Sequence, residues 1–295
     1  MSLGDGGHPL LPEDLGSDDV VLLGWPVSHS LSPAMHAAAA EHLGLPLRYR
    51  ALAVPPEDLS DVIGALGRRG IMGANVTVPH KIRAVEECGA LTTEARLVGA
   101  VNTLRWERGD TSEILEGHNT DATGLAQALR HQIADLHDAR VVLIGTGGAA
   151  RAAAVALTRC GARVTVVGRR RQACVEILEL VSATDEIGGA PLGIVDLADD
   201  SALKSTIDDA LLVMNATSLG LQGEHLPKPC EELSPHQIAY DLVYGRATPF
   251  LEAARRRNVR GHDGLMMLVH QAVEAFAFWT GERPPVTVMV SAATG

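Results

Sequence analysis

A glycine-rich turn between an apolar strand and an alanine-rich helix constrains the fold most. The segment Arg-Val-Val-Leu-Ile runs directly into this turn, and residues 149–160 have a helical pattern. The glycines of the turn are Gly145, Gly147 and Gly148. The first permits a tight turn, the second lets a ligand approach the backbone, and the small Ala150 permits close packing of the helix on the strand. With a second apolar strand at 163–167, the spacing predicts a βαβ unit over residues 140–171.

This unit also predicts a dinucleotide site, because the helix N-terminus directs unpaired N–H groups and a partial positive charge toward a pyrophosphate. Proteins that bind NAD place Asp or Glu after the second strand to hold the ribose hydroxyls. This chain instead has Gly168 followed by three arginines, whose guanidinium groups suit a 2′-phosphate. We therefore expect NADP, with a solvated basic turn as the alternative. The predicted cofactor residues are Gly145, Gly147, Gly148, Ala149, Arg169 and Arg170.

The chain has 295 residues, which exceeds the usual size of one domain, and 46% of them are apolar. Short apolar runs alternate with helical patterns, which predicts mostly parallel α/β sheets. Strands are expected at 20–23, 49–54, 73–78, 100–106, 140–144, 163–167, 211–215 and 238–242. Helices are expected at 33–43, 59–69, 123–132, 149–160 and 264–280.

The position of the βαβ unit predicts two domains. Residues 18–122 would form an N-terminal, mostly parallel α/β substrate domain, and residues 123–261 a Rossmann-type NADP-binding domain. The C-terminal segment 262–295 would fold back and complete the first domain. Ligand sites favour such domain junctions, so we expect a cleft between the two domains.

Charge and hydropathy narrow the classes of partner. The formal net charge of −11 argues against a nucleic-acid surface. No apolar run approaches the roughly 20 residues that span a bilayer. Residues 1–17 lack the pattern of a signal peptide and are expected to form a loose lead-in. The four cysteines have no metal-ligand spacing, which predicts no metal site and favours reduced thiols in a cytoplasmic protein.

Polar blocks follow or adjoin the predicted strands of the first domain. In the first, Ser32 has the character of an N-cap with Pro33 at the first helical position, and the serine hydroxyls also suit a substrate carboxylate. In the second, a strand ends at Pro79 and Lys81 follows; a lone lysine there is usually a surface residue. Segments 100–103 and 117–121 add amides, hydroxyls and an acid. Together these blocks predict a site that recognises several hydroxyl groups.

The order and content of eight blocks resemble the shikimate dehydrogenase family over nearly the whole chain, from about Val20 to Pro285. The blocks are Ser30-Leu31-Ser32-Pro33, Asn75-Val76-Thr77-Val78-Pro79-His80-Lys81, Gly99-Ala100-Val101-Asn102-Thr103, Asn119-Thr120-Asp121, Gly145-Thr146-Gly147-Gly148-Ala149, Asn215-Ala216-Thr217-Ser218, Asp241-Leu242-Val243-Tyr244, and Asp263-Gly264-Leu265 through Gln271.

The resemblance implies an enzyme that reduces 3-dehydroshikimate to shikimate with NADPH, reversibly, in the pathway to chorismate and the aromatic amino acids. It implies that Lys81 and Asp121 form the catalytic pair. It assigns substrate binding to Ser30, Ser32, Thr77, Asn102, Tyr244, Gln271 and Asp121. It adds Asn215, Thr217, Ser218 and Gly264 to the cofactor site.

Three positions depart from the family pattern. Gly168 replaces the usual Asn before the arginine, Met266 stands where a second Gly is common, and Ala122 follows Asp121 where Gly is frequent. The first departure leaves the expected NADP preference to the arginines alone. The alternatives are a dual quinate/shikimate dehydrogenase, a non-catalytic dinucleotide-binding regulator, and a purely structural or interaction protein. We expect a monomer or a homodimer.

Overall fold

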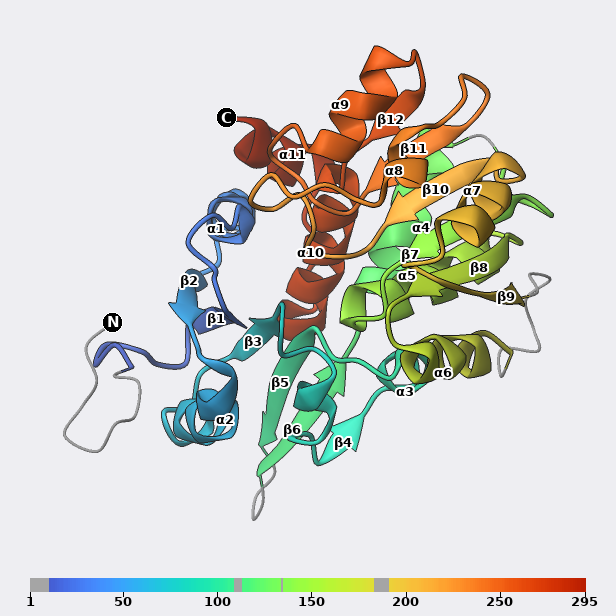
Figure 1. Ribbon diagram of the computed structural model, residues 1–295. Helices are drawn as coiled ribbons and strands as arrows, with labels where there is room; N and C mark the ends of the chain where they lie inside the picture. The colour runs from blue at the N-terminus through green and yellow to red at the C-terminus, as the bar shows by residue number, and fades with distance from the viewer. Residues whose placement is uncertain (1–10, 109–112, 134, 183–190) are drawn as a thin grey trace. The chain divides into compact units, whose positions relative to one another are not determined.

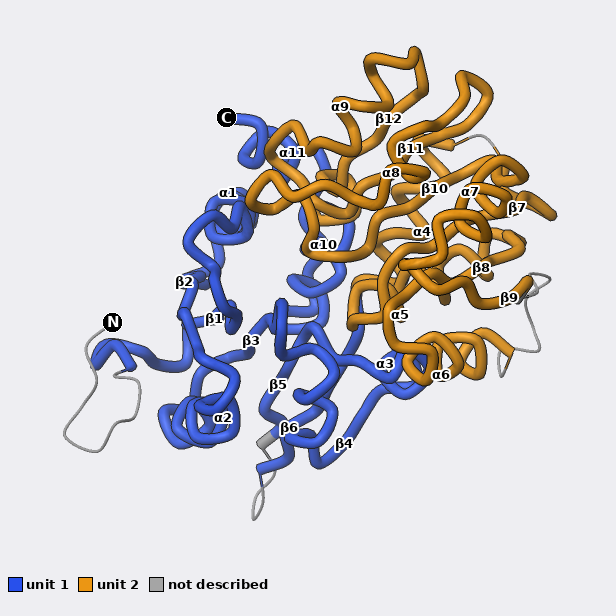
Figure 2. The backbone as a smooth tube through the Cα atoms, viewed as in Figure 1, with its two compact units in different colours: residues 1–120, 269–295 blue, residues 121–268 orange. Residues whose placement is uncertain are grey.

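The computed structural model describes residues 11–295 except 109–112, 134 and 183–190 (Figure 1). The chain divides into two compact units (Figure 2). Unit 1 consists of residues 1–120 and 269–295, and unit 2 consists of residues 121–268. Among the described residues, no helix combines the length and the apolar character that crossing a bilayer requires.

Unit 1 is built around a six-stranded sheet with helices packed against it. Its elements are β1 (Asp19–Gly24), α1 (Ser32–Leu43), β2 (Arg48–Ala53), α2 (Leu59–Arg68), β3 (Gly73–Val76), β4 (Ala90–Leu91), α3 (Thr93–Val98), β5 (Thr103–Arg108), β6 (Glu113–His118) and α11 (Val286–Thr294), with 3₁₀ turns at Pro56–Asp58 and Arg83–Val85. Helix α10 (Leu265–Thr280) begins in unit 2 and ends in unit 1.

The unit 1 sheet has the order β2-β1-β3-β5-β6-β4 and is mixed. The pairs β1–β2, β1–β3 and β4–β6 are parallel, whereas β3–β5 and β5–β6 are antiparallel. The expected parallel character therefore holds on one side of the sheet, and an antiparallel β5–β6 hairpin extends the other. Strand β6 was not expected, because its sequence Glu-Ile-Leu-Glu-Gly-His lacks a clear apolar run.

Side chains of α2 form the core on one face of this sheet. Leu59, Val62, Ile63 and Leu66 recur at helical spacing and are buried in one cluster with Val21 and Leu23 of β1. Every residue of β1 is buried, which explains the unbroken apolar run Val20–Leu23 within it.

The C-terminal half of α10 packs closely on β3. The Trp279 indole N–H donates to the Leu104 carbonyl at 3.0 Å. A Cβ at Gly73 would lie 2.3 Å from Nε1 of that indole. A glycine at position 73 therefore lets the helix approach the strand.

Unit 2 is a doubly wound α/β domain. Its elements are α4 (Asp121–Gln132), β7 (Arg140–Ile144), α5 (Gly148–Arg159), β8 (Arg163–Gly168), α6 (Arg171–Ser182), β9 (Pro191–Asp196), α7 (Asp200–Asp208), β10 (Leu212–Asn215), α8 (Lys228–Glu231), β11 (Ile238–Asp241), α9 (Pro249–Arg256) and β12 (Arg260–His262). All strands are parallel in the order β12-β11-β10-β7-β8-β9, which is the Rossmann order read from the far edge. The predicted Rossmann-type domain is thus confirmed.

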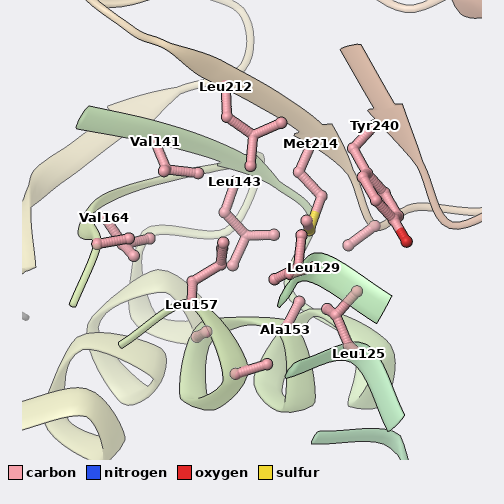
Figure 3. Packing of buried hydrophobic residues seen from close by; sticks show 14 of the residues in the cluster. Leu125, Leu129, Val141, Leu143, Ala153, Leu157, Val164, Leu212, Met214 and Tyr240 are labelled. Atoms are coloured by element: carbon pink, nitrogen blue, oxygen red, sulfur yellow. The ribbon is translucent and has the colours of Figure 1, made fainter. Parts of the chain in front are cut away.

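The central strand β7 is buried on both faces. Figure 3 shows Val141 and Leu143 directed toward helices that contribute Leu129 and Leu157. The alternate residues of β7, Val142 and Ile144, belong to a second cluster, which includes side chains of α7 and α9. Because successive side chains of a strand point to opposite faces, burial on both faces gives the unbroken apolar run that the sequence shows.

Candidate active site

The loops after β1 and β3 lie side by side at the carboxyl edge of the unit 1 sheet. The Trp25 N–H donates to the Val78 carbonyl at 3.0 Å, and the Thr77 N–H donates to the Leu23 carbonyl at 2.8 Å. A Cβ at Gly24 would lie 2.3 Å from Cγ2 of Thr77, so the glycine makes room for this side chain. The sequence predicts a strand over residues 73–78. Strand β3 ends at Val76, and Thr77 and Val78 instead pair with the backbone around the end of β1.

The two serines lie in one turn at the start of α1, but their roles differ from the expectation. Ser32 does not cap the helix; it is the first helical residue, and Leu31 occupies the cap position without a side-chain bond. The Ser30 hydroxyl accepts the Ser32 N–H at 3.2 Å. Ser30 thus satisfies one of the N–H groups that a helix start leaves unpaired, because Leu31 already has helical backbone angles.

The loop that carries Lys81 is held on both sides. The buried His80 ring donates its Nε2–H to the Val54 carbonyl at 2.8 Å. Burial lowers the pKa of His80 from its ordinary value. The Lys81 carbonyl accepts the Val101 N–H at 2.8 Å. The His80 ring and the Lys81 carbonyl thus tie the loop to the residues that follow β2 and precede β5.

Buried amides gather at the same edge of the sheet. The Asn102 side chain donates to the Thr120 hydroxyl at 2.9 Å and accepts the Thr120 N–H at 2.8 Å. Gln271, from α10, brings its Oε1 to 3.4 Å from the Thr120 hydroxyl and 3.5 Å from Nδ2 of Asn102. Segments that are distant in sequence thus meet, and a loop, a strand end and a helix each contribute one polar side chain.

A second group of buried polar side chains, which was not predicted from the sequence, holds the backbone at Asn102. The Tyr49 hydroxyl donates to Oδ1 of Asn75 at 2.7 Å. Nδ2 of Asn75 donates to the Asn102 carbonyl at 2.9 Å and to the Thr103 hydroxyl at 3.1 Å. The signal was present in the sequence, because a buried amide in an otherwise apolar strand needs partners.

The remaining predicted substrate and catalytic residues belong to unit 2. Asp121 follows Thr120 directly, is buried and begins α4. Tyr244 lies in the loop after β11 and is half-buried. Unit 1 therefore gathers Ser30, Ser32, Thr77, Lys81, Asn102 and Gln271, whereas Asp121 and Tyr244 lie outside it.

The glycine turn of unit 2 fits a dinucleotide. Gly145 has φ +124°, and a Cβ there would lie 2.8 Å from the Ala216 carbonyl oxygen. Gly147 is the cap residue of α5, and a Cβ there would meet no atom within 4 Å. Gly148 and Ala149 form the first turn of that twelve-residue helix. Open space at a helix N-terminus suits an anion such as a pyrophosphate.

The loop after β10, residues 215–219, packs against this turn. Asn215 is fully buried, and its Nδ2 donates to the Leu219 carbonyl at 3.0 Å and to Asp241 at 2.9 Å. Its Oδ1 accepts from the Thr217 N–H at 3.1 Å and from the Thr217 hydroxyl at 2.7 Å. Both amide hydrogens are thus used within the protein, so Asn215 shapes the loop. Ser218 is exposed at the tip of the loop.

Positive charge gathers where β8 passes into α6. Arg169 and Arg170 are exposed, and Arg171 begins the helix. Cations are unfavourable at a helix N-terminus, so the arrangement suits a bound anion. A Cβ at Gly168 would lie 2.7 Å from Cγ2 of Thr146 and 2.8 Å from Sγ of Cys174, which explains the glycine at this position.

Gly264 also has a structural reason. A Cβ there would lie 2.2 Å from the Leu242 carbonyl oxygen, so only glycine permits this close approach of two loops. Met266, the other departure in this segment, packs against the main core cluster of unit 2. Within the described ranges, no group of three or more His, Cys, Asp or Glu side chains is arranged to hold a metal ion.

Comparison with known proteins identifies the family. A family profile described as "Shikimate dehydrogenase substrate binding domain" matches residues 22–104, and "Shikimate 5'-dehydrogenase C-terminal domain" matches residues 264–294. A "Putative NAD(P)-binding" profile matches residues 133–234. The shikimate dehydrogenase (NADP(+)) of Moorella thermoacetica is 41% identical over 273 residues, 92% of this chain and 90% of that protein. The chain belongs to the shikimate dehydrogenase family.

Solved structures in the family agree with the fold. Shikimate 5-dehydrogenase from Thermus thermophilus, in complex with NADP(H) and shikimate, has a TM-score of 0.77 and 36% identity, and covers 94% of this chain and 98% of its own. The enzyme from Listeria monocytogenes, in complex with shikimate and NAD, has a TM-score of 0.78 and 29% identity, and covers 95% and 98%. The expected family and the two-domain α/β fold are therefore confirmed.

Proposed function

We propose that this chain catalyses the reversible reduction of 3-dehydroshikimate to shikimate with NADPH, in the pathway to chorismate and the aromatic amino acids. The observation that carries the proposal is a set of polar side chains at one end of the adjoining strands β1, β3, β5 and β6: the Ser30–Ser32 turn, Lys81 and the Asn102–Thr120 pair, joined by Gln271 of α10. Family membership and the dinucleotide turn of unit 2 support the same reaction.

Ser30 and Ser32 would bind the substrate carboxylate. Both lie at the N-terminus of α1, a helix of 12 residues, where hydroxyl donors and the helix dipole favour an anion. Tyr244 would add a third hydroxyl to this carboxylate site.

Thr77, Asn102, Gln271 and Asp121 would hold the hydroxyl groups of the ring. The contact between Asn102 and Gln271 is 3.5 Å, long for a hydrogen bond. A substrate hydroxyl can replace it with two shorter bonds, because it can accept from Nδ2 of Asn102 and donate to Oε1 of Gln271.

Lys81 would act on the carbonyl oxygen. The bound cofactor supplies the hydride to the carbonyl carbon. Negative charge then grows on the oxygen, and the Lys81 ammonium stabilises this charge and donates the proton. In the reverse direction the Lys81 amine accepts the proton of the hydroxyl. Asp121 would orient Lys81 and a neighbouring substrate hydroxyl.

Arg169 and Arg170 would bind the 2′-phosphate of NADP, while Gly145, Gly147, Gly148 and Ala149 form the pyrophosphate turn. The loop of Asn215, Thr217 and Ser218, together with Gly264, would complete the site. Three arginines at the start of α6 support this assignment, because an anion relieves their mutual repulsion.

A two-substrate, two-cofactor activity matrix tests the proposal. Shikimate and quinate are each oxidised with NADP and with NAD, and absorbance is followed at about 340 nm, the nicotinamide band that reports reduction of these cofactors. The proposal expects the highest kcat/KM for shikimate with NADP. Comparable turnover of quinate would support the dual enzyme, and dinucleotide binding without turnover of either substrate would support the regulator.

The proposal extends to a cytoplasmic enzyme that is a monomer or a homodimer. The four cysteines are all unpaired, which supports a reducing compartment. Sedimentation equilibrium measures the oligomeric state, and a trimer or larger assembly would contradict this part of the proposal.

A further inference from the structure

Asp241 is a fully buried carboxylate at the carboxyl end of β11, directly beside Asn215 at the end of β10. Its Oδ1 accepts from Nδ2 of Asn215 at 2.9 Å and from the Val243 N–H at 3.1 Å. Its Oδ2 accepts from the Thr248 hydroxyl at 2.7 Å. Three donors from three segments therefore converge on one side chain, and the carboxylate is the centre of a polar network at this end of the sheet.

The Asn215 side chain carries this network into the loop of residues 215–219. It connects Asp241 to the Leu219 carbonyl and to both polar groups of Thr217. The Leu219 N–H in turn donates to the Thr217 hydroxyl at 3.1 Å. Rotating the Asn215 amide by half a turn would place its NH₂ group against the two Thr217 donors. Asp241 therefore reinforces the amide orientation that the Thr217 N–H and the Leu219 carbonyl also require, because a carboxylate accepts only from the NH₂ side.

This loop occupies the place where an open α/β sheet binds its ligand. Strands β7 and β10 are neighbours at the point where the strand order reverses, and ligands bind outside the carboxyl ends of such a strand pair. One side of the crevice is the turn at Gly145, whose backbone touches Ala216, and the other is the loop that Asn215 shapes. Asp241 lies one strand farther out and is covered by this loop.

We propose that Asp241 is a positioning residue for the dinucleotide: its carboxylate orients the Asn215 amide and thereby holds the 215–219 loop in the shape that the cofactor contacts. The inference rests on the proposed use of a dinucleotide by unit 2. In this proposal Asp241 acts on the cofactor through Asn215, while its bonds to the Val243 N–H and the Thr248 hydroxyl hold the loop that follows β11.

Titration with NADPH, monitored by the fluorescence of NADPH in the absence of substrate, tests whether Asp241 acts through Asn215. Asp241→Ala leaves the buried Asn215 NH₂ group with one of its two acceptors, the Leu219 carbonyl, and the Kd of this variant for NADPH is expected to rise about tenfold or more. Asn215→Ala cuts the same bond from the other side and is expected to raise the Kd similarly. Asp241→Asn keeps one oxygen for Asn215 and Val243 and is expected to bind NADPH almost as the unmodified protein does.

The double variant Asn215→Ala/Asp241→Ala gives the decisive comparison. If Asp241 acts through Asn215, the double variant binds NADPH no more weakly than Asn215→Ala alone. Additive increases in Kd, or unchanged affinity in a folded Asn215→Ala variant, would overturn the proposal. The second criterion holds even if Asp241→Ala fails to fold.

Gln237→Leu is the matched control for a purely structural effect. Gln237 is also buried, and it immediately precedes β11. Its NH₂ group donates to the carbonyls of Ile207 and Ala210, so it lies at the opposite end of the strand from Asp241. Its replacement is expected to lower Tm without changing the Kd for NADPH. A rise in Kd equal to that of Asp241→Ala would contradict a specific role for Asp241.

Measuring turnover of shikimate as well as binding of NADPH distinguishes failure of this inference from failure of the proposed reaction. Asp241→Ala is expected to raise the KM for NADP more than the KM for shikimate, because the serine turn and the amide cluster lie in unit 1, whereas only Tyr244 follows a residue that Asp241 binds. If the unmodified chain binds NADPH but does not oxidise shikimate, the proposed reaction fails and the affinity test of Asp241 still stands. If it binds no dinucleotide, both fail.

Discussion

Lys81 gains its position from backbone contacts on both sides, and its side chain is the group we assign to proton transfer. We expect Lys81→Ala to lower kcat by about 10²–10⁴, the usual contribution of a general acid, while the KM for shikimate changes little. Steady-state kinetics in both directions measure this effect. Lys81→Arg, which retains a cation but cannot deprotonate, serves as the control and should also be slow. A kcat within a few-fold of the unmodified value would exclude the assignment.

Arg169 is the residue that we expect to select the cofactor. Arg169→Ala should raise the KM for NADP strongly and leave that for NAD nearly unchanged, because only NADP carries the 2′-phosphate. Kinetics with both cofactors at saturating shikimate provide the measurement. Equal changes for the two cofactors would show that Arg169 does not bind the 2′-phosphate.

The space at Gly168 is already filled, so the family's usual Asn does not fit here without adjustment. Gly168→Asn is expected to lower the free energy of unfolding by about 1–3 kcal/mol, because its Cβ overlaps Thr146 and Cys174. Gly147→Ala is the control, since its Cβ would enter open space. That variant should retain its Tm and lose affinity for NADP. Chemical unfolding and NADPH titration of both variants check the contrast, and an unchanged stability of Gly168→Asn would contradict the overlap.

Helix α1 packs against its neighbours through a buried histidine. The His36 ring stacks on Tyr49 with centroids 4.3 Å apart and lies 6.0 Å from the ring of Phe276. Among the described residues, neither ring nitrogen of His36 has a hydrogen-bond partner. Burial lowers the pKa of His36 to about 3. The histidine therefore remains neutral in the folded protein under conditions in which the unfolded chain would bind a proton.

The stability of this packing should depend on pH. Below a pH of about 6.5 the unfolded chain binds a proton at His36 that the folded chain does not, so the free energy of unfolding falls as pH falls toward about 3. At pH 5 the loss from this residue is about 2 kcal/mol. Urea unfolding at pH 7.5 and pH 5 should show that His36→Gln loses less stability than the unmodified protein. His29→Gln, at an exposed position, should behave like the unmodified protein; equal losses in all three would contradict the argument.

The elements that could be predicted from the sequence are those buried on both faces or with a regular apolar stripe. Strand β7 has the predicted bounds 140–144, and α2 follows its apolar stripe of Leu59, Val62, Ile63 and Leu66. The short β4 and the half-exposed β6 lack such a signal, because pairing with neighbouring strands, and not their own sequence, makes them strands. Ser32 was predicted as the cap of α1, but Leu31 occupies the cap position, and the Ser30 hydroxyl accepts the Ser32 N–H.

At the scale of the whole molecule, the two units should respond to different ligands. We expect NADP alone to slow amide hydrogen exchange in peptides that contain residues 145–151 and 215–219. Shikimate alone should slow exchange in peptides that contain residues 30–33 and 77–81. Bound ligand protects the backbone that contacts it, because local opening must then release the ligand. Hydrogen exchange measured by mass spectrometry checks these expectations. Protection of the 145–151 peptide by shikimate alone would contradict the assignment of NADP to unit 2 and of shikimate to unit 1.

The site could be predicted only in part. The glycine turn and the arginines act through local backbone and charge, so their spacing alone indicates an anion site. Asn75, His80 and Asp241 support functional residues through contacts with strands that are distant in sequence, and no local pattern specifies those partners. The pairing of Lys81 with Asp121 came from family resemblance, and it remains a prediction.

The chain leaves unit 1 after Thr120 and returns to it at Val269, and the Thr120 hydroxyl lies 3.4 Å from Oε1 of Gln271. Residues 121–268 are thus an insertion into unit 1, and the chain leaves and re-enters unit 1 at points that lie close together. Its second junction falls within α10, where each added or deleted residue turns the helix by about 100°. Exchange of residues 121–268 for the insert of a relative must therefore preserve the helical phase, or Gln271 will turn away from Asn102.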